Sequence, residues 1–463
     1  MAEPLTVETT PIAGLLIVRI PLHLDERGWF KENWQRQAMV SLGLPDFQPA
    51  QNNISMNIHR GTVRGIHAEP WDKLVSVAAG RVFGVWVDLR KGEDFGKVFT
   101  AEIGPETAVY VPSGVANGFQ TLEDNTAYTY LVNEHWSKDA VYTMVNYADP
   151  HLGIKWPLPL SEAHTSEKDR SHPMLNDVRP IESKPILVLG ATGQVGKAFL
   201  ISDLNTVHLG RDQVDFENPD AFAGIDFSKY SAVVNTVAYT DVDGAESGDG
   251  RVSAWKINAR ALSNLVKAIT GTNIPLVHLS SDYIFDGTNP AFSTEESHYC
   301  PLGVYGQTKA AGDIIVSSYP KHLILRTSWV VGDGHNFVAT MARRARAGLD
   351  SKVVNDQFGR LTFASELVAA TKHLLESNSQ FGVYNVTNSG VEGSWYGIAR
   401  RIYAVTGANP ELVRPVTTDE YGREKAMAPR PKFSLLKLDK LAKTGFVPAD
   451  WTDALTVYLN SGI

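Results

Sequence analysis

This sequence has a single cysteine, no long apolar run and no excess of positive charge. Cys300 is the only cysteine among 463 residues, so no disulfide can form within the chain, as is usual in a reducing cytoplasm. No window approaches the roughly 18 uninterrupted apolar residues of a membrane span. The N-terminus has no basic segment followed by an apolar run, so we expect no secretory signal. The net charge of -8 disfavours nucleic-acid binding. We therefore expect a cytoplasmic protein that binds neither membrane nor nucleic acid.

The sequence changes character at about residue 184, and its length is too great for one ordinary core. Residues 1–160 contain short apolar runs separated by Gly, Pro, Asp and Asn, which is typical of an all-β jelly roll. Residues 161–184 are polar and predict a tail or linker, part of which could pack on the first domain. Over residues 185–463, apolar strands alternate with helical segments, which predicts an α/β Rossmann domain with a doubly wound parallel sheet.

His67 is the first candidate catalytic residue, because it follows Arg-Gly on an expected strand, with Lys73 six residues later. An imidazole that is oriented by a buried carboxylate, such as that of Asp149, makes a general base near neutral pH. Taken singly, these residues are more often a core histidine, a solvated lysine and a turn. Tyr128 and Tyr130 share one face of a strand and would ordinarily belong to the core or its rim. One histidine with scattered carboxylates is a poor metal site, so we expect no metal.

Six motifs over residues 10–180 carry a family resemblance: DERGWFKE, QNNIS, RGIHAEPWDK, VDLRKGEDFGK, VPSGVANGFQ and NYADPHLGIKWP. In this order they resemble the dTDP-4-dehydrorhamnose 3,5-epimerase family, a cupin-like jelly roll that dimerises. The resemblance implies His67 as the base with Asp149 behind it, and Tyr130 as the acid on the opposite face. It implies that Lys73 faces the ketone oxygen, where a cation stabilises the enolate. The positions implied to contact the substrate are Arg27, Phe30, Glu32, Gln51, Asn53 and Arg64.

Two departures from commoner members of this family leave alternatives open. Asn117 stands where many members have His, and the loop from His67 to Lys73 is short. An epimerase of carbon 3 alone, joined to a reductase for another deoxysugar nucleotide, therefore remains possible. In a further alternative, one half of the chain is a non-catalytic dimerisation or sugar-binding module.

The second domain opens on a glycine-rich turn. Gly190, Gly193 and Gly196 form G-x-x-G-x-x-G after an expected strand and before an expected helix, the arrangement that holds a dinucleotide pyrophosphate. The next expected strand ends at Arg211, where NAD-binding domains carry an acidic residue. An arginine there can pair with a 2′-phosphate, so we expect NADPH, with NADH possible.

Three residues further along the chain predict a proton-transfer site. Tyr305 and Lys309 are four residues apart and share one face of an expected helix, and Ser281 ends the preceding strand. A lysine ammonium beside a tyrosine favours its phenolate, which suits proton exchange with a substrate oxygen during hydride transfer. An isolated Y-x-x-x-K is usually an ordinary surface pair, but all three ingredients in order favour catalysis.

The motifs GATGQVG, VAYTDVDGAE, SSDYIFDG, PLGVYGQTK, LRTSWVVG, VNDQFGRLT and APRPKFSLL cover this domain. They resemble the dTDP-4-dehydrorhamnose reductases, within the extended short-chain dehydrogenase/reductase superfamily. The resemblance implies Ser281, Tyr305 and Lys309 as catalytic residues, Trp329 as a substrate contact, and a small C-terminal part that binds the substrate. The expected cofactor contacts are Gly190, Thr192, Gly193, Gln194, Val195, Gly196, Arg211, Asp215, Phe216, Ala238, Tyr239, Thr240, Tyr305 and Lys309. No carboxylate cluster in the sequence calls for magnesium.

Together, the two resemblances imply consecutive steps on one nucleotide sugar. The first domain would epimerise carbons 3 and 5 of dTDP-4-dehydro-6-deoxy-glucose. The second would reduce the 4-ketone with NADPH to give dTDP-L-rhamnose. The family resemblance also implies a homodimer formed through the N-terminal jelly roll.

Overall fold

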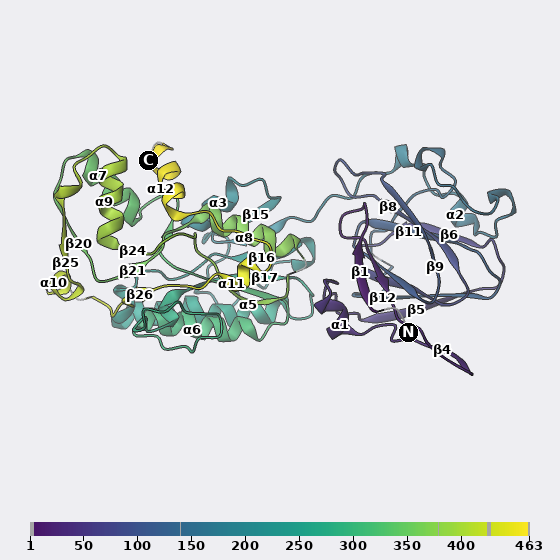
Figure 1. The fold of residues 1–463 in the computed structure, drawn as a ribbon, viewed down its shortest axis with the longest axis horizontal. Coiled ribbons are helices and arrows are strands. Elements are labelled where there is room, and N and C mark those ends of the chain that lie inside the picture. The colour runs from purple at the N-terminus through teal and green to yellow at the C-terminus, as the bar shows by residue number, and fades with distance from the viewer. Residues whose placement is uncertain (1–3, 139, 378, 424–426, 462–463) are drawn as a thin grey trace. The chain divides into compact units, whose positions relative to one another are not determined.

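The computed structural model describes residues 4–138, 140–377, 379–423 and 427–461. The chain forms two compact units, the first ending at Ser183 and the second beginning at Lys184 (Figure 1). The first is rich in β-strands and the second contains a parallel sheet, which confirms the two-domain organisation expected from the sequence. No helix in the described part of the chain is long and apolar enough to cross a membrane.

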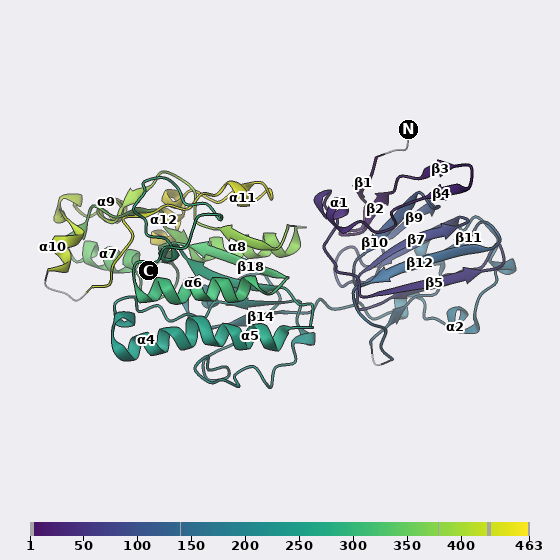
Figure 2. The same ribbon diagram turned by 90° about the horizontal axis from the view of Figure 1, so that it is seen from below.

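The N-terminal unit consists of two antiparallel sheets that share a core (Figure 2). In order across the six-stranded sheet lie β1 (Thr6–Thr9), β2 (Leu16–Arg19), β10 (Thr107–Val111), β7 (Lys73–Ala79), β12 (Thr126–Val132) and β5 (Gln51–Asn57). The five-stranded sheet is β13 (Thr143–Met144), β6 (Val63–Ala68), β11 (Val115–Thr121), β8 (Val82–Asp88) and β9 (Val98–Ile103). Val75 and Val77 of the first sheet and Trp86 and Phe119 of the second belong to one buried cluster. The side chains between the sheets therefore form the core.

Smaller elements flank this sandwich. The hairpin of β3 (His23–Asp25) and β4 (Gly28–Phe30) is exposed along its length. Two short helices, α1 (Arg36–Ser41) and α2 (Glu167–Arg170), and 3-10 turns at Pro150–Leu152, Leu160–Glu162 and Leu175–Asp177 complete the unit.

The polar stretch that was expected to be a tail or linker is bonded to the first unit. The backbone N–H of Val63 donates to the carbonyl of His164, and Lys91 donates to Ile181, each at 2.9 Å. The side chain of Asn146 donates to the carbonyls of Arg170 and His172. These residues are therefore held as the last segment of the N-terminal unit.

The C-terminal unit contains a six-stranded parallel sheet. Its order is β15 (Thr206–Leu209), β14 (Ile186–Leu189), β16 (Ala232–Asn235), β17 (Leu276–Ser281), β18 (His322–Thr327) and β23 (Gly382–Asn385). Alternate residues of β14 enter different cores. Val188 packs with α3 (Gln194–Leu200) and α8 (Ala364–Glu376). Leu187 and Leu189 pack with α5 (Ala261–Ile269) and α6 (Val304–Ser317). The sheet is thus covered by helices on both faces.

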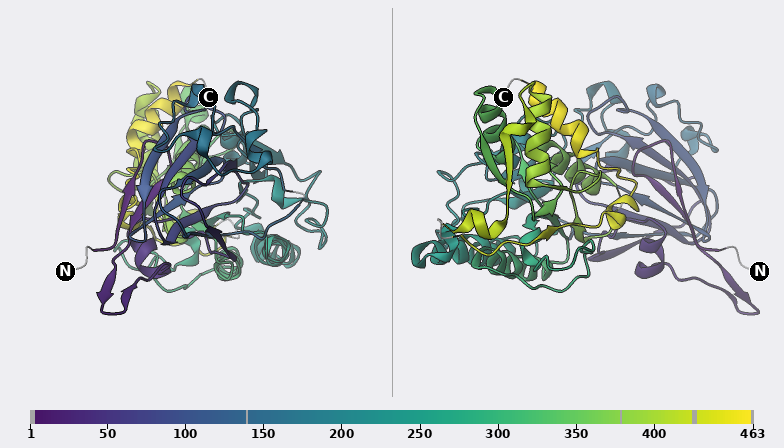
Figure 3. Two further views of the ribbon diagram at one scale, coloured as in Figure 1. Left: turned by 90° about the vertical axis from the view of Figure 1, so that its right-hand side faces the viewer. Right: turned by 60° about the vertical axis from the view of Figure 1, so that its left-hand side comes forward.

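Residues near the C-terminus form a smaller layer with its own core. Its main helices are α7 (Phe337–Arg346), α9 (Trp395–Val405) and α12 (Trp451–Asn460), and α12 lies beside α9 (Figure 3). The remaining elements of the unit are α4 (Gly248–Trp255), which continues through a π-helical segment at Lys256–Arg260, α10 (Thr418–Gly422), α11 (Asp439–Ala442), 3-10 turns at Phe227–Lys229, Gly244–Glu246, Asp282–Ile284 and Pro410–Leu412, and the short strands β19 (Val330–Val331), β20 (Ser351–Val354), β21 (Phe358–Gly359), β22 (Thr362–Phe363), β24 (Gly393–Ser394), β25 (Val413–Val416) and β26 (Phe433–Ser434).

Candidate active sites

His67 points into the space between the two sheets of the N-terminal unit. It lies on β6 opposite Asn117 of β11, and Asn117 in turn lies opposite Trp86, a residue of the inter-sheet core. Residues directly opposite one another in a sheet share a face. The imidazole is partly accessible, with 31% of the side chain exposed. It therefore lies at the rim of the core, where a ligand can reach it.

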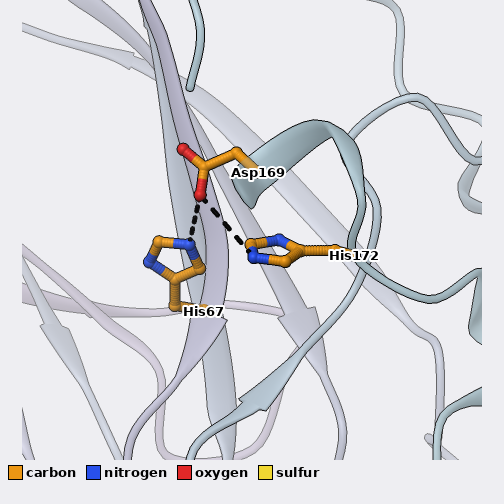
Figure 4. Close-up of side chains that lie close together, drawn as sticks. All are labelled: His67, Asp169 and His172. Carbon is orange, nitrogen blue, oxygen red and sulfur yellow. Dashed lines mark hydrogen bonds and ion pairs between the residues drawn. The ribbon is translucent and has the colours of Figure 1, made fainter. Parts of the chain in front are cut away.

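The carboxylate bonded to His67 is that of Asp169, with Nε2 of the histidine 2.9 Å from Oδ1 (Figure 4). Asp169 belongs to α2, whose first turn is capped by Ser166: the backbone N–H of Asp169 donates to the Ser166 hydroxyl at 3.0 Å. Burial acts to raise the pKa of Asp169, but its interactions with His67, His172 and Ser166 together outweigh that effect, so the pKa lies below its usual value. Asp169 is thus ionised and accepts from the imidazole.

The expectation that Asp149 stands behind His67 was wrong. Asp149 caps the turn Pro150–Leu152 and accepts from the backbone N–H and the ring Nδ1 of His151, at 2.8 and 2.9 Å. Its other oxygen accepts from the backbone N–H of Leu175. Asp149 therefore fixes the final segment of the unit, and Asp169, on that segment, meets the histidine.

Asp169 was missed because it lies in the stretch interpreted as a tail or linker. The sequence does contain a signal for it: Ser166 and Asp169 have the S-x-x-D spacing of a helix N-terminus. That spacing predicts a short helix, but it does not tell which strand the helix packs against.

Lys73 and Tyr130 come from the facing six-stranded sheet. Tyr130 on β12 lies opposite both Val75 and Asn53, and Lys73 is two residues from Val75, so all share the face that looks toward the other sheet. The Lys73 ammonium lies 5.8 Å from the centroid of the Tyr130 ring. Burial raises the pKa of the Tyr130 phenol, which therefore stays protonated at neutral pH. The imidazole thus approaches from one sheet and the phenol from the other.

Asn117 and Glu69 hold the Lys73 side chain. Lys73 is 5% exposed at its side chain and donates from Nζ to Asn117 Oδ1 at 2.7 Å. It also forms an ion pair with Glu69 Oε2 at 2.6 Å. Burial lowers the pKa of Lys73, and the Glu69 carboxylate opposes that effect. Asn117, the departure noted in the sequence, is therefore a ligand of the buried ammonium, and Glu69 is a contact that the sequence analysis missed.

The predicted substrate-contact positions fall into two groups. Gln51 and Asn53 lie on β5 and bond to each other at 2.8 Å, and Arg64 on β6 donates to Asn57 at 2.8 Å. The second group lies on or beside the exposed β3–β4 hairpin: Arg27, Phe30 and Glu32. The guanidinium of Arg27 is 85% exposed and pairs only with Asp25 among the described residues.

In the C-terminal unit, the glycine-rich turn connects β14 to α3. Gly190 has a φ of +98°, which favours glycine. A Cβ atom on Gly196 would lie 2.0 Å from the carbonyl oxygen of Gly190, so the helix can approach the strand this closely only with glycine there. Around Gly193, by contrast, the nearest atom to an added Cβ is 3.7 Å away, which leaves open space at the helix start. The backbone is shaped as a pyrophosphate-binding turn requires.

The residues predicted to contact the cofactor differ in how exposed their side chains are. Arg211 follows β15 and is 74% exposed, with Glu217 at 3.1 Å and Asp215 at 3.8 Å. The side chain of Phe216 is buried and packs against Phe222, so it belongs to the core of this unit. The remaining positions line the same end of the sheet: Thr192 in the turn, Gln194 and Val195 in α3, and Ala238, Tyr239 and Thr240 after β16.

Ser281, Tyr305 and Lys309 come together in this unit. Ser281 is the last residue of β17, and the other two lie on α6, where Lys309 donates to the carbonyl of Leu279 at 2.7 Å. Burial lowers the pKa of Lys309 to about 8. Burial raises the pKa of Tyr305 to about 12, although an interaction with the Ser281 hydroxyl opposes this. The expected phenolate is therefore not favoured: Tyr305 is protonated at neutral pH and can donate its proton.

Trp329 stacks on a residue that lines a cavity in the small C-terminal layer. Its ring stacks on that of Trp395 with centroids 3.7 Å apart. Trp395 lines a cavity of about 370 Å³, together with the cationic side chains of Lys352 and Arg430. An aromatic wall beside two cations can accept a base and an attached phosphate group.

Comparisons with known proteins divide along the same boundary. Residues 9–177 match the family model of dTDP-4-dehydrorhamnose 3,5-epimerase, and residues 184–462 match that of the RmlD substrate binding domain. This chain is 48% identical over 186 residues to a Streptococcus pyogenes protein called "Protein RmlC homolog", covering 39% of this chain and 93% of the relative. It is 34% identical over 286 residues to a dTDP-4-dehydrorhamnose reductase of Mycolicibacterium smegmatis, covering 59% of this chain and 85% of the relative. A crystal structure of a Bacillus anthracis dTDP-4-dehydrorhamnose reductase in complex with NADP is similar at 30% identity and a TM-score of 0.56, covering 60% of this chain and 99% of that one.

Proposed function

Because this chain belongs both to the dTDP-4-dehydrorhamnose 3,5-epimerase family and to the RmlD family, we propose that its two sites act in turn on one nucleotide sugar to form dTDP-L-rhamnose. The observation that carries this proposal is that each unit has its own complete set of proton-transfer groups. His67–Asp169, Lys73 and Tyr130 form the set in the first unit, and Ser281, Tyr305 and Lys309 form the set in the second.

In the epimerase site, His67 removes a proton from a carbon beside the ketone of dTDP-4-dehydro-6-deoxy-glucose. Asp169 is ionised and can only accept, so the ring proton of His67 lies on Nε2 and the lone pair of the base on Nδ1. The ammonium of Lys73 stabilises the negative charge that develops on the ketone oxygen. Tyr130, which is protonated and lies on the facing sheet, returns a proton to the opposite face of the carbon. The same cycle at carbons 3 and 5 inverts both.

In the reductase site, Tyr305 and Ser281 hold the 4-ketone oxygen, and Tyr305 donates its proton to that oxygen as the carbon is reduced. NADPH, when bound, supplies the hydride. Lys309 in its ammonium form electrostatically stabilises the phenolate that Tyr305 leaves behind. The open turn at Gly193 and the N-terminal end of α3 fit the pyrophosphate, and Arg211 fits the 2′-phosphate.

We place the nucleotide part of the second substrate in the cavity beside Trp395. Lys352 and Arg430 line it and can pair with the diphosphate. Arg430 is also bonded to Asp243 at 2.9 Å, which fixes its direction. Trp329 stacks on Trp395 and so acts on this cavity through its neighbour.

We also propose that the N-terminal unit is a cupin-like jelly roll that forms a homodimer in the cytoplasm. On β5, an edge strand of its sheet, Ile54 is 69% and Met56 55% exposed, and Ile58 follows at 63%. An apolar row of this kind on a sheet edge favours association with a second copy. Light scattering of the wild type and of Ile54→Lys tests this: a dimer that weakens in the variant is expected, and an unchanged monomer contradicts it.

The whole proposal is tested by supplying dTDP-4-dehydro-6-deoxy-glucose as sole substrate, following NADPH absorbance and identifying the product. We expect NADPH oxidation and dTDP-L-rhamnose. His67→Asn should stop the reaction, and a separate epimerase should restore it, whereas Tyr305→Phe should allow solvent deuterium to enter the sugar without NADPH oxidation. Deuterium at carbon 3 but not at carbon 5 would instead support the alternative of a 3-epimerase. Failure of wild type that a separate epimerase rescues would show that the N-terminal unit is not catalytic.

A further inference from the structure

The surroundings of His67 contain a second histidine that the proposed epimerisation does not use. His172 follows α2, and its Nε2 lies 3.7 Å from Oδ1 of Asp169, the same oxygen that accepts from His67 (Figure 4). The two imidazole rings meet edge to face, with centroids 5.1 Å apart. Two imidazoles and one carboxylate thus converge on a single point. The sequence-based expectation of no metal assumed one histidine here, and the fold supplies two.

His172 is buried in this cluster without a hydrogen bond. It is 8% exposed, and within the described residues neither of its ring nitrogens has a hydrogen-bond partner. Its backbone is held in place, since its carbonyl accepts from the side chain of Asn146 at 3.1 Å. A buried polar group without a partner costs free energy unless something binds to it. The unsatisfied nitrogen facing Asp169 therefore calls for a ligand.

We propose that His67, Asp169 and His172 form a reversible binding site for zinc or a similar divalent transition-metal ion. One nitrogen from each histidine and one carboxylate oxygen all lie within 4.8 Å of one another. Bonds of tetrahedral zinc to such ligands would place the ligand atoms about 3.3 to 3.6 Å apart. The distances of 2.9 and 3.7 Å from Asp169 Oδ1 to the two histidine nitrogens bracket this range, and rotation of the side chains would bring the two nitrogens into it as well. Imidazole ligands favour zinc, cobalt and nickel over magnesium, and the fourth position is left for water.

Metal bound here switches off the base without filling the substrate site. The ion takes Nε2 of His67, so the ring proton moves by exchange with solvent from Nε2 to Nδ1, and the ring stays neutral. The lone pair on Nδ1 that the proposed mechanism uses is then absent. The catalytic constant of epimerisation therefore falls while KM for the sugar nucleotide stays the same. This consequence rests on the proposed role of His67, whereas the metal site itself does not.

Binding is tested first, with the full chain and no substrate. Titration with Co²⁺ should give the visible absorbance of tetrahedral cobalt, and Zn²⁺ should displace it. His172→Phe and His172→Gln are both expected to weaken zinc binding at least about tenfold. The matched control is His164→Phe, because His164 stacks on His59 in the same unit, with centroids 4.7 Å apart, but outside this cluster. Unchanged affinity in both His172 variants, or equal weakening in the control, would overturn the site.

The effect on catalysis is then measured as the ratio of solvent-deuterium incorporation with and without zinc within each variant. In wild type we expect a loss of at least about tenfold at saturating zinc, reversed by a chelator. Reduction of pre-epimerised substrate by the same chain is the internal control and should not change. Zinc that binds through His172 but leaves deuterium incorporation intact would keep the site and overturn its link to the base. Loss of the metal-free activity in His67→Asn checks the role of His67 separately.

Discussion

Replacing Asp169 by asparagine should remove most of the epimerase activity while leaving the reductase of the same chain intact. The His67–Asp169 bond has one ionised partner and is 2.9 Å long, and Asp169 is largely buried. Hydrogen bonds to charged groups contribute about 1.5 to 3 kcal/mol, which corresponds to roughly a 10- to 150-fold loss of rate. Asparagine also changes the tautomer of His67, because its amide N–H can donate to Nε2 and thereby move the ring proton to Nδ1. We therefore expect Asp169→Asn to lose more activity than Asp169→Ala.

The assay is incorporation of solvent deuterium into the sugar, with reduction of pre-epimerised substrate measured on the same sample. Asp149→Asn is the matched control, since it removes the same charge but its carboxylate contacts His151 and Leu175 rather than His67. It should lower the melting temperature of the N-terminal unit, while the rate per folded molecule stays close to that of the wild type. The reasoning would be refuted if Asp169→Asn kept full activity, or if folded Asp149→Asn were the inactive variant.

Three further outcomes are expected. Burial holds the pKa of Lys309 at about 8, below its ordinary 10.5, so the unfolded chain binds more protons between these pH values and this group makes stability rise with pH through that window. Lys309→Met should accordingly abolish reduction and raise the free energy of unfolding at pH 7 by up to about 3 kcal/mol, seen as a higher melting temperature. A lower melting temperature would show that the bond to the Leu279 carbonyl outweighs the cost of burying the ammonium. Gly196→Ala places a Cβ 2.0 Å from the Gly190 carbonyl oxygen. NADPH binding, measured by fluorescence, should therefore be lost, while epimerisation is retained. Unaltered NADPH binding would contradict the close packing of the turn. Asn117→Ala removes a hydrogen-bond acceptor from the buried Lys73 ammonium, at a cost of about 1 to 3 kcal/mol, and should slow deuterium incorporation about 5- to 150-fold; an unchanged rate would mean that Glu69 alone holds the lysine.

Features set by neighbours along the chain were predictable, and features set by contacts between distant segments were not. The glycine turn and the Tyr305–Lys309 spacing are local: the turn leads into α3, and Tyr305 and Lys309 both lie on α6, as expected. The partner of His67 is a hundred residues away in sequence, and an Asp-Pro turn was a more visible candidate than a carboxylate in a polar tail. The protonation of Tyr305 could not be predicted either, because it depends on burial rather than on the adjacent lysine. His172 is only three residues from Asp169, so their proximity is local, but no motif marks the pair and only the fold brings both to His67.

The last segment of the N-terminal unit determines where this chain can be divided. Because Asp169 and His172 lie beyond residue 160, an N-terminal fragment that ended with the sandwich strands would keep its two sheets and lose the carboxylate that orients the base. A cut between Ser183 and Lys184 would leave both sets of catalytic groups whole. A truncation that is meant to keep both sites therefore has to leave residues 161–183 with the N-terminal unit.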